Sequence, residues 1–332
     1  MNHRGMSVMI LVVLSVWMLP VTAQEKLGDL VAQGGYDWVI GRWVATTDQG
    51  EKAEFRYEWT LDKHAILVDT ILGNFKYRGM IMLMPTDGEI TEIGADNRGG
   101  IWKGSWSEDS AGLSHRIEHT NAQGEVRKGD IIHTRIDTDT ITIAIYAVDN
   151  SGSRNAEPWA KLTYKRQPAA TATASSTSGQ AGGTTDYQTL GDLVSQGGYE
   201  WMIGKWVAGE GDKKYELEQK PILDKHAALM DVKIGDFKYQ GIVMCAPARQ
   251  DITQIGADSF GGIWKGTWSQ DPDGAACRWE YIKVDGSAQK LEHVYVKGDN
   301  DTLKVRQYDI AASGARASEP RDELVFKRQK PN

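Results

Sequence analysis

The chain contains one sequence written twice, and this repeat constrains the fold more than any other feature. Residues 27–43, LGDLVAQGGYDWVIGRW, recur at 190–206 as LGDLVSQGGYEWMIGKW. The blocks LDKHA, FKY, GAD, GGIWKG and a closing KRQ then follow in the same order in both copies. A chain of 332 residues has room for two domains of ordinary size. We therefore predict two domains of the same fold, at 24–167 and 190–332.

Two further segments lie outside the repeat. Residues 1–23 carry Arg4, an apolar run at 6–20 and small residues before position 24, which is the pattern of a secretory signal peptide. The alternative, a retained membrane anchor, needs about 20 apolar residues, more than this run offers. Residues 168–189 are almost all Ala, Thr, Ser and Gly, so we predict a flexible linker. Two domains on such a linker need share no interface.

The charge of the chain argues against a nucleic-acid partner. The formal net charge is −7, and the loss of Arg4 with the signal peptide would make it more negative. Binding to nucleic acid calls for a basic face. After the signal peptide no segment is apolar enough to span a membrane. We expect a secreted or periplasmic protein and leave its oligomeric state open.

Strand signals dominate both copies. Short runs rich in β-branched and aromatic residues alternate with turn clusters, and only 27–33 is typical of a short helix. Nine or ten antiparallel strands must hide their edges, which favours an up-and-down barrel, with a two-sheet sandwich as the alternative. The fold class is all-β. In copy one the expected strands are 52–59, 65–72, 75–84, 89–95, 101–107, 113–120, 129–137, 141–148 and 159–165.

Period-two alternation predicts which side chains face the interior of each barrel. Ile71 is replaced by Lys233 in copy two, so the face of strand 65–72 that carries Ile71 should meet water. Besides Ile71, this wet face holds Ala65, Leu67 and Asp69. The residues expected to point inward are His64, Ile66, Val68, Thr70, Tyr77, Gly79, Ile81, Leu83, Trp102, Gly104, Trp106, His115, Ile117 and His119.

A Gly-x-Trp motif on the first strand of each copy suggests a family. Gly41-Arg42-Trp43 and Gly204-Lys205-Trp206 each follow a short helical segment, and each copy ends in a strand that closes on KRQ. This pattern resembles the opening of lipocalin-like (calycin) barrels. Leu61-Asp62, Gly79 and the turn at 85–88 are further similar to uncharacterised secreted bacterial domains of lipocalin-like type.

The resemblance implies a role for the motif and for the last strand. In these barrels the tryptophan closes the narrow end, and a basic residue of the last strand lies over it. The matching pairs are Trp43 with Arg166 and Trp206 with Arg328. A guanidinium can stack on an indole face, which would lock the barrel. The resemblance also implies a cavity for a small molecule, and it implies no common reaction.

The identical block GGIWKG-x-W is the most distinctive ligand-site signal. Two tryptophans with a glycine between them can stack a flat or hydrophobic ligand, or they can simply fill the core. His64 and His226 are the only histidines present in both copies. Each could supply a polar contact inside the barrel or merely bond a turn carbonyl. The candidate ligand-binding residues are His64, Tyr77, Trp102, Trp106 and His115 in copy one, and His226, Tyr239, Trp264 and Trp268 in copy two.

Metal and disulfide chemistry are weaker alternatives. His64, His115 and His119 could form a three-histidine metal or haem site, but copy two has Cys277 and Tyr281 in place of the last two. We expect no metal and no cofactor. Cys245 and Cys277 should lie three strands apart, about 14 Å, whereas a disulfide needs Cα atoms within about 7 Å. Two buried free thiols are therefore expected, with a disulfide as the alternative.

These observations favour an exported, non-enzymatic protein that binds a small hydrophobic or aromatic molecule inside its barrels. One alternative is an interaction module of the cell envelope with filled barrels. A second is a hydrolase or isomerase that uses a cavity histidine or carboxylate. Serine-nucleophile motifs, zinc-protease helices and dinucleotide loops are absent from the sequence, and no carboxylate stands out from the others.

Overall fold

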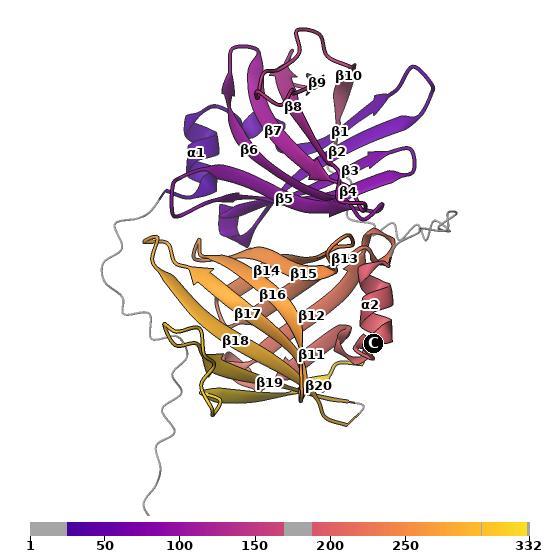
Figure 1. The fold of residues 1–332 in the computed structure, drawn as a ribbon. Coiled ribbons are helices and arrows are strands. Elements are labelled where there is room, and N and C mark those ends of the chain that lie inside the picture. The colour runs from indigo at the N-terminus through magenta and orange to yellow at the C-terminus, as the bar shows by residue number, and fades with distance from the viewer. Residues whose placement is uncertain (1–24, 169–187, 300, 331–332) are drawn as a thin grey trace, which may run out of the picture.

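The chain folds into two closed antiparallel barrels of ten strands each, arranged in tandem (Figure 1). The computed structural model describes residues 25–168, 188–299 and 301–330. The all-β fold and the tandem barrels confirm the prediction from the repeat. The predicted signal peptide and nearly all of the predicted linker lie outside the described residues.

Consecutive strands of the first barrel are neighbours, and β1 closes the sheet against β10. Closure leaves no free strand edge, which is the physical advantage of this architecture. The strands are β1 (Gly41–Thr46), β2 (Lys52–Thr60), β3 (Ala65–Leu72), β4 (Phe75–Leu83), β5 (Ile90–Asp96), β6 (Ile101–Asp109), β7 (Gly112–Thr120), β8 (Val126–Arg135), β9 (Thr140–Ala147) and β10 (Ala160–Gln167).

The second barrel repeats this order, and β11 closes against β20. Its strands are β11 (Gly204–Ala208), β12 (Tyr215–Ile222), β13 (Ala227–Ile234), β14 (Phe237–Ala246), β15 (Asp251–Asp258), β16 (Ile263–Asp271), β17 (Gly274–Ile282), β18 (Ala288–Lys297), β19 (Thr302–Asp309) and β20 (Asp322–Arg328).

Short helices precede or connect the strands. A seven-residue helix leads into each barrel, and a 3-10 turn joins it to the first strand. Among the described residues, no helix is long and apolar enough to cross a membrane. The helical segments are α1 (Leu27–Gln33), η1 (Asp37–Val39), η2 (Leu61–Lys63), α2 (Leu190–Gln196), η3 (Glu200–Met202), η4 (Gly211–Lys213) and η5 (Leu223–Lys225).

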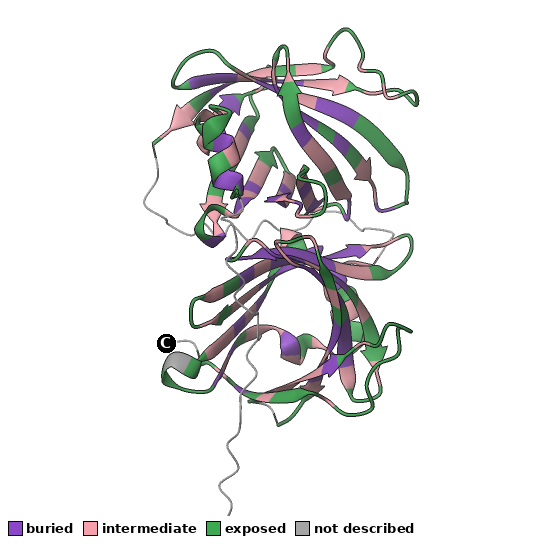
Figure 2. Ribbon diagram, turned by 90° about the vertical axis from the view of Figure 1, so that its left-hand side faces the viewer, coloured by how far each residue is buried: buried purple, intermediate pink, exposed green. Residues whose placement is uncertain are grey.

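The interior of each barrel is an apolar and aromatic core. Ile66, Val68, Tyr77, Ile81 and Trp106 belong to one buried cluster in the first barrel, as their period-two positions predict. The residues between them range from buried to exposed, and Figure 2 accordingly shows purple next to pink and green along the strands. The second barrel has an equivalent cluster.

His64 does not share this inward face, so its predicted position is wrong. The three residues before it, Leu61 to Lys63, all have positive φ angles, and β3 begins only at Ala65. The strand alternation therefore does not extend back to position 64. A Cβ atom on Gly261 would lie 2.9 Å from His64 Nδ1, which places this imidazole against the second barrel.

The two barrels pack against each other through an interface. The predicted flexible linker did not require one. Outward-facing apolar residues of β3 to β6 and of β13 to β17 form one buried cluster that spans both barrels. In Figure 1 β4 and β5 lie beside β13, β14 and β15. The buried members of this cluster are Leu61, Ala65, Met80, Met82, Met84, Ala95, Ala227, Leu229, Ile242, Met244, Ile255, Ala257, Ile263 and Ile282.

This interface corrects the predicted wet face of β3. Ala65 does point out of its barrel, as the alternation requires, but it is completely buried because the second barrel covers it. Ile71, farther along the same face, is 42% exposed. Period-two alternation thus assigns the outside of a barrel correctly, but it cannot tell solvent from a neighbouring domain.

The interface is nearly two-fold symmetric. Lys76 Nζ lies 3.1 Å from the Asp224 carboxylate, and the equivalent Lys238 Nζ lies 3.2 Å from the Asp62 carboxylate. Each lysine comes from an FKY block and each aspartate from an LDKH block. The barrels therefore pack as the two halves of an isologous dimer, in which the same surface serves on both sides.

Candidate ligand site

Each barrel is plugged at one end by an indole beneath a guanidinium. The Arg166 guanidinium carbon lies 4.1 Å from the centre of the Trp43 ring, and Arg328 lies 4.1 Å from Trp206. Arg166 also donates to the carbonyls of Trp38 and Ile40, at 2.6 and 2.7 Å. Both tryptophans are buried, so this pair seals the barrel end in both copies.

A buried carboxylate anchors the next ring of side chains in the first barrel. Asp96 accepts hydrogen bonds from Trp102 Nε1 at 2.7 Å, from the Gly100 amide at 2.9 Å and from His119 Nε2 at 3.2 Å. Trp102 and His119 stack, with ring centres 4.2 Å apart. Burial pushes the pKa of Asp96 up, but these hydrogen bonds outweigh it, so its pKa lies below the ordinary value.

The second barrel keeps this arrangement with one change. Asp258 accepts from Trp264 Nε1 at 2.8 Å, and Trp264 stacks on Tyr281 at 4.2 Å. Tyr281 stands where the first barrel has His119. Burial raises the pKa of Asp258 above its ordinary value. The same carboxylate position is therefore easier to protonate in the second barrel than in the first.

A second buried carboxyl, Glu92 on β5, distinguishes the first barrel. Its oxygens accept hydrogen bonds from Tyr77 Oη at 2.7 Å and from Trp106 Nε1 at 3.0 Å. His115 Nε2 lies 3.6 Å from Glu92 Oε2, too far for a hydrogen bond. Burial raises the pKa of Glu92 to about 7, although its two hydrogen bonds oppose the shift. Glu92 therefore changes charge near neutral pH.

Two histidines complete this cluster in a neutral form. The His115 ring stacks on Trp106 with ring centres 4.4 Å apart, and His133 Nε2 lies 2.9 Å from Tyr57 Oη. Burial lowers the pKa of each histidine to about 3. Both imidazoles are therefore uncharged at neutral pH, and each has one nitrogen that can accept a hydrogen bond.

Glycines create the space for this cluster. Gly79 and Gly94 are register partners on β4 and β5, and a Cβ atom on either would lie within 2.6 Å of Tyr77 Oη. Without these side chains the Tyr77 hydroxyl can extend along the wall to Glu92. Gly104 serves His115 in the same way, because a Cβ there would lie 2.3 Å from its Nε2. Close approach of side chains thus explains these three glycines.

In the second barrel the same positions hold uncharged groups. Gln254 replaces Glu92, Cys277 replaces His115, and Tyr295 replaces His133. Gln254 Oε1 accepts from Trp268 Nε1 at 3.0 Å, and its Nε2 donates to Tyr239 Oη at 2.9 Å. The hydrogen bond between this position and the tyrosine has therefore reversed its direction.

The interiors are not sealed from solvent everywhere. Trp102, Trp264 and Trp268 all point inward, yet each keeps an intermediate exposed fraction. Trp106, at the matching place to Trp268, is buried. The inner tryptophans therefore border accessible space in both barrels, and more of them do so in the second.

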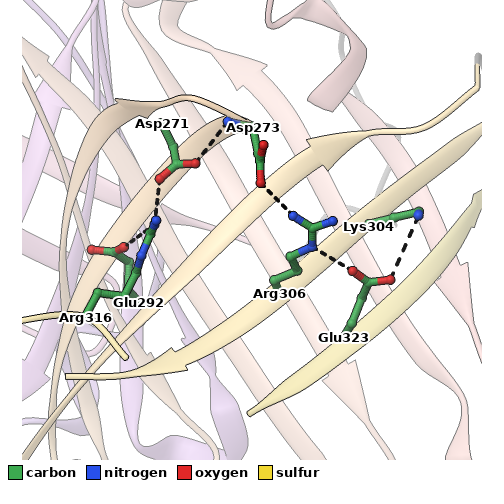
Figure 3. A network of polar contacts seen from close by, with 7 residues as sticks. All are labelled: Asp271, Asp273, Glu292, Lys304, Arg306, Arg316 and Glu323. Carbon is green, nitrogen blue, oxygen red and sulfur yellow. Dashed lines mark hydrogen bonds and ion pairs between the residues drawn. The ribbon is translucent and has the colours of Figure 1, made fainter. Parts of the chain in front are cut away.

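The outer wall carries carboxylates that are already paired with arginines. Figure 3 shows a network of acidic and basic side chains on the second barrel, with one part around Arg316 and the other around Arg306. Arg316 lies 2.6 Å from Asp271 and 2.9 Å from Glu292, and Arg306 bridges Asp273 and Glu323, both at 2.7 Å. Glu292 is as deeply buried as a core residue, but its arginine partners neutralise it. Within the described residues Glu92 has no such partner, and the nearby His115 is uncharged at neutral pH.

A pocket of about 320 Å³ lies where the outer wall of the second barrel meets the first. Gln240 bridges the two barrels there, donating to Asp231 at 2.7 Å and accepting from Thr60 Oγ1 at 3.0 Å. In the first barrel Arg78 occupies the matching place and binds Asp69 through two contacts of 2.6 and 2.8 Å. The lining residues are Thr60, Leu61, Lys205, Trp206, Glu216, Leu217, Glu218, Asp231, Val232, Lys233, Lys238, Tyr239, Gln240 and Gln329.

The structure brings together most of the candidate residues from the sequence, but not the repeated histidines. Tyr77, Trp106 and His115 meet around Glu92, whereas His64 and His226 lie at the interface between the barrels. Burial lowers the pKa of His226, and the largest opposing charge effect comes from Asp96 of the other barrel. Neither histidine is among the residues that the structure places around Glu92.

Metal binding and a disulfide find no support in the described part of the chain. No group of three or more His, Cys, Asp or Glu side chains there is arranged to hold a metal ion. Cys245 and Cys277 are free and buried, and they belong to different apolar clusters. The raised pKa of Cys277, caused mainly by burial, keeps this thiol protonated and unreactive.

Glu92 and His133 were not predicted from the sequence, although two features point to Glu92. In strand 89–95 it shares a face with Gly94, and in the structure Gly94 lies against the Tyr77 hydroxyl. The replacement of Glu92 by Gln254, which has the same shape without the charge, also indicates a buried position. His133 carries no comparable signal, because copy two has a tyrosine there.

Comparisons with known proteins do not assign the chain to a family. No protein-family model matches it, and no curated protein gives a significant match. Among solved structures, it is similar to the crystal structure of a protein with unknown function from the DUF3598 family of Nostoc punctiforme PCC 73102. The alignment covers 88% of this chain and 97% of that chain, with a TM-score of 0.20 and 10% identity. A likeness this weak carries no argument about function.

Proposed function

We propose that the chain is a non-enzymatic binding protein, of lipocalin-like type, that holds a small hydrophobic or aromatic molecule inside its barrels. Barrels of eight strands already enclose one small ligand, and ten strands make a wider interior. Aromatic side chains line that interior, and the tryptophan–arginine plug lies at one end of it. The signal-peptide pattern supports a place of action outside the cytoplasm.

One observation carries this proposal. Within the described residues, His115 Nε2 in the first barrel and Gln219 Nε2 and Trp279 Nε1 in the second are buried without a hydrogen-bond partner. Each unsatisfied buried polar group costs about 1–3 kcal/mol. A bound molecule with complementary polar atoms would offset that cost, and its apolar part would pack on the tryptophans.

A fluorescence screen tests the proposal. The intact protein is titrated with a library of aromatic and aliphatic compounds while tryptophan emission is recorded, and native mass spectrometry of protein purified from its own host shows what co-purifies. We expect at least one compound to bind, and Trp102→Ala or Trp264→Ala to weaken binding to the altered barrel. An interior that binds nothing in the screen and carries nothing from the host contradicts the proposal.

A second candidate function has one specific observation in its favour. A carboxyl with a pKa of about 7 beside a neutral imidazole is suited to general acid–base catalysis. An enzyme would turn the bound compound over, and Glu92→Gln would abolish turnover while preserving the fold. A carrier would release the compound unchanged, so product analysis of the screening mixtures separates the two functions.

A further inference from the structure

We propose that the first barrel binds a small aromatic organic cation, a protonated primary amine, with its ammonium group between Glu92 and His115. This inference rests on the proposed binding function and adds the chemical class of the ligand. It concerns the first barrel alone, because the second has the uncharged Gln254 and Cys277 at these positions.

The geometry provides two adjacent acceptors. Glu92 Oε2 and His115 Nε2 lie 3.6 Å apart, and His115 Nε2 has no partner among the described residues. With Glu92 ionised and the His115 proton on Nδ1, both atoms are acceptors and cannot satisfy one another. An ammonium group has three N–H donors and no acceptor, so it can donate to both atoms at once.

The charges of the cluster favour a cation over other ligands. The Glu92 carboxylate has two neutral donors, Tyr77 and Trp106, and within the described residues no lysine or arginine forms an ion pair with it. A buried charge without a counterion is costly. A cationic ligand would supply the missing charge, whereas an anionic ligand would add a second negative charge beside Glu92.

The aromatic rings around the carboxyl support the same class of ligand. Tyr57 and Trp106 meet edge to face with ring centres 6.2 Å apart, and Tyr77 and Trp102 meet in the same manner at 5.7 Å. The faces of such rings attract organic cations. They also pack well against an aromatic group on the ligand, so an arylalkylamine matches both features of the interior.

Binding of a cation should be linked to the protonation of Glu92. The groups that face this carboxyl are Tyr77 from β4, Trp106 from β6, His115 from β7 and Tyr57 from β2. None of them carries a positive charge at neutral pH. The ionised carboxylate binds the cation, and the protonated form does not, so affinity should rise with pH until Glu92 is fully ionised.

Calorimetric titration of the full chain tests this inference. The probes are 2-phenylethylamine, its neutral analogue 2-phenylethanol and the anion 3-phenylpropionate. At pH 8 we expect one amine per chain, bound more tightly than the other two probes. Glu92→Gln should weaken amine binding by about a hundredfold, because the buried charge pair is lost. Glu323→Gln, the same substitution on the outer wall, should leave the affinity unchanged.

The pH dependence gives a readout that needs no variant. From pH 8 to pH 6 amine affinity should fall by about tenfold, and binding at pH 6.5 should release protons. Binding of 2-phenylethanol should not change with pH. If the amine binds no tighter than the alcohol, or Glu92→Gln binds it equally well, the cation inference is wrong. Binding of the alcohol alone would leave the proposed carrier function standing, and binding of no probe would overturn the cation inference while the library screen decides the carrier function.

Discussion

The two barrels have the same strand order and the same tryptophan–arginine plug, but they differ in the side chains that they enclose. Arginine and tryptophan lie at the same 4.1 Å in both, and the tyrosine and tryptophan around position 92 or 254 are the same residue types. Around them the first barrel holds Glu92 and His115, whereas the second holds Gln254 and Cys277. The elements that determine the fold are thus separable from the chemistry of the interior.

The exchange of Glu92 for Gln254 shows how an interior can change charge without losing its packing. Both side chains accept a hydrogen bond from a tryptophan at 3.0 Å. Toward the tyrosine, however, Glu92 accepts a hydrogen bond and Gln254 donates one. A tyrosine hydroxyl can do either, so it adapts to both partners.

The largest effect should come from the shared plug. Trp43→Ala and Trp206→Ala each remove a completely buried indole, and we expect each to destabilise its own barrel by about 3–5 kcal/mol. Urea unfolding followed by hydrogen exchange and mass spectrometry resolves the peptides of each barrel. A barrel that tolerates the loss of its tryptophan would show that the two ends are not closed in the same way.

Next in size is a pH effect confined to the first barrel. The pKa of Glu92 rises from 4.5 to about 7 on folding, so the folded state holds its proton more tightly and its stability is lost as pH rises through this range. The loss should reach ~3 kcal/mol. The pKa values of His115 and His133 are lowered to about 3, so these two residues act in the opposite sense. The barrel loses stability as the pH falls below 6.5 because the histidines are protonated in the unfolded state only.

Exchanging the two residues tests this pH effect. Because the two histidines oppose this effect below pH 6.5, the contribution of Glu92 is read as the stability difference between the parent protein and Glu92→Gln, and this difference should fall by ~3 kcal/mol between pH 4.5 and 7. Relative to the parent protein, Gln254→Glu should introduce a loss of the same sign into the second barrel. Urea midpoints measured barrel by barrel at several pH values provide the comparison. An unchanged profile in Glu92→Gln would mean that Glu92 does not ionise inside the barrel.

The smallest effect concerns the ion pairs between the barrels. Lys76→Met and Lys238→Met each remove one partly exposed lysine–aspartate pair, and we expect losses below about 1 kcal/mol. The two losses should be equal, because the interface is nearly symmetric. Thermal unfolding at low and high salt measures them. A large difference between the two variants would indicate that the two lysine–aspartate pairs contribute unequally to the interface.

Much of the fold could be predicted because a barrel strand has a strict period of two. The inward positions of Tyr77, Ile81 and Trp106 follow from that period, and the repeat supplied a second example of each strand. His64 escaped the rule because the preceding turn, with its run of positive φ angles, interrupts the alternation. Local patterns describe strands well and the turns between them poorly.

The candidate site was harder to predict for a different reason. Identity between the copies drew attention to the LDKHA and FKY blocks, yet Asp62 and Lys76 serve the interface between the barrels. Glu92, which differs between the copies, is the group that gives the first interior its charge. A shared block can therefore reflect shared packing, and only the three-dimensional register separates this from shared chemistry.

The symmetric contact between the barrels has one more consequence. In an ordinary homodimer every substitution appears in both subunits, so neither interior can change without the other. Covalent fusion removes this restriction while retaining the mutual support of the paired outer walls. One barrel can then keep an ionisable interior while the other becomes neutral, so a single chain can present two different interiors side by side.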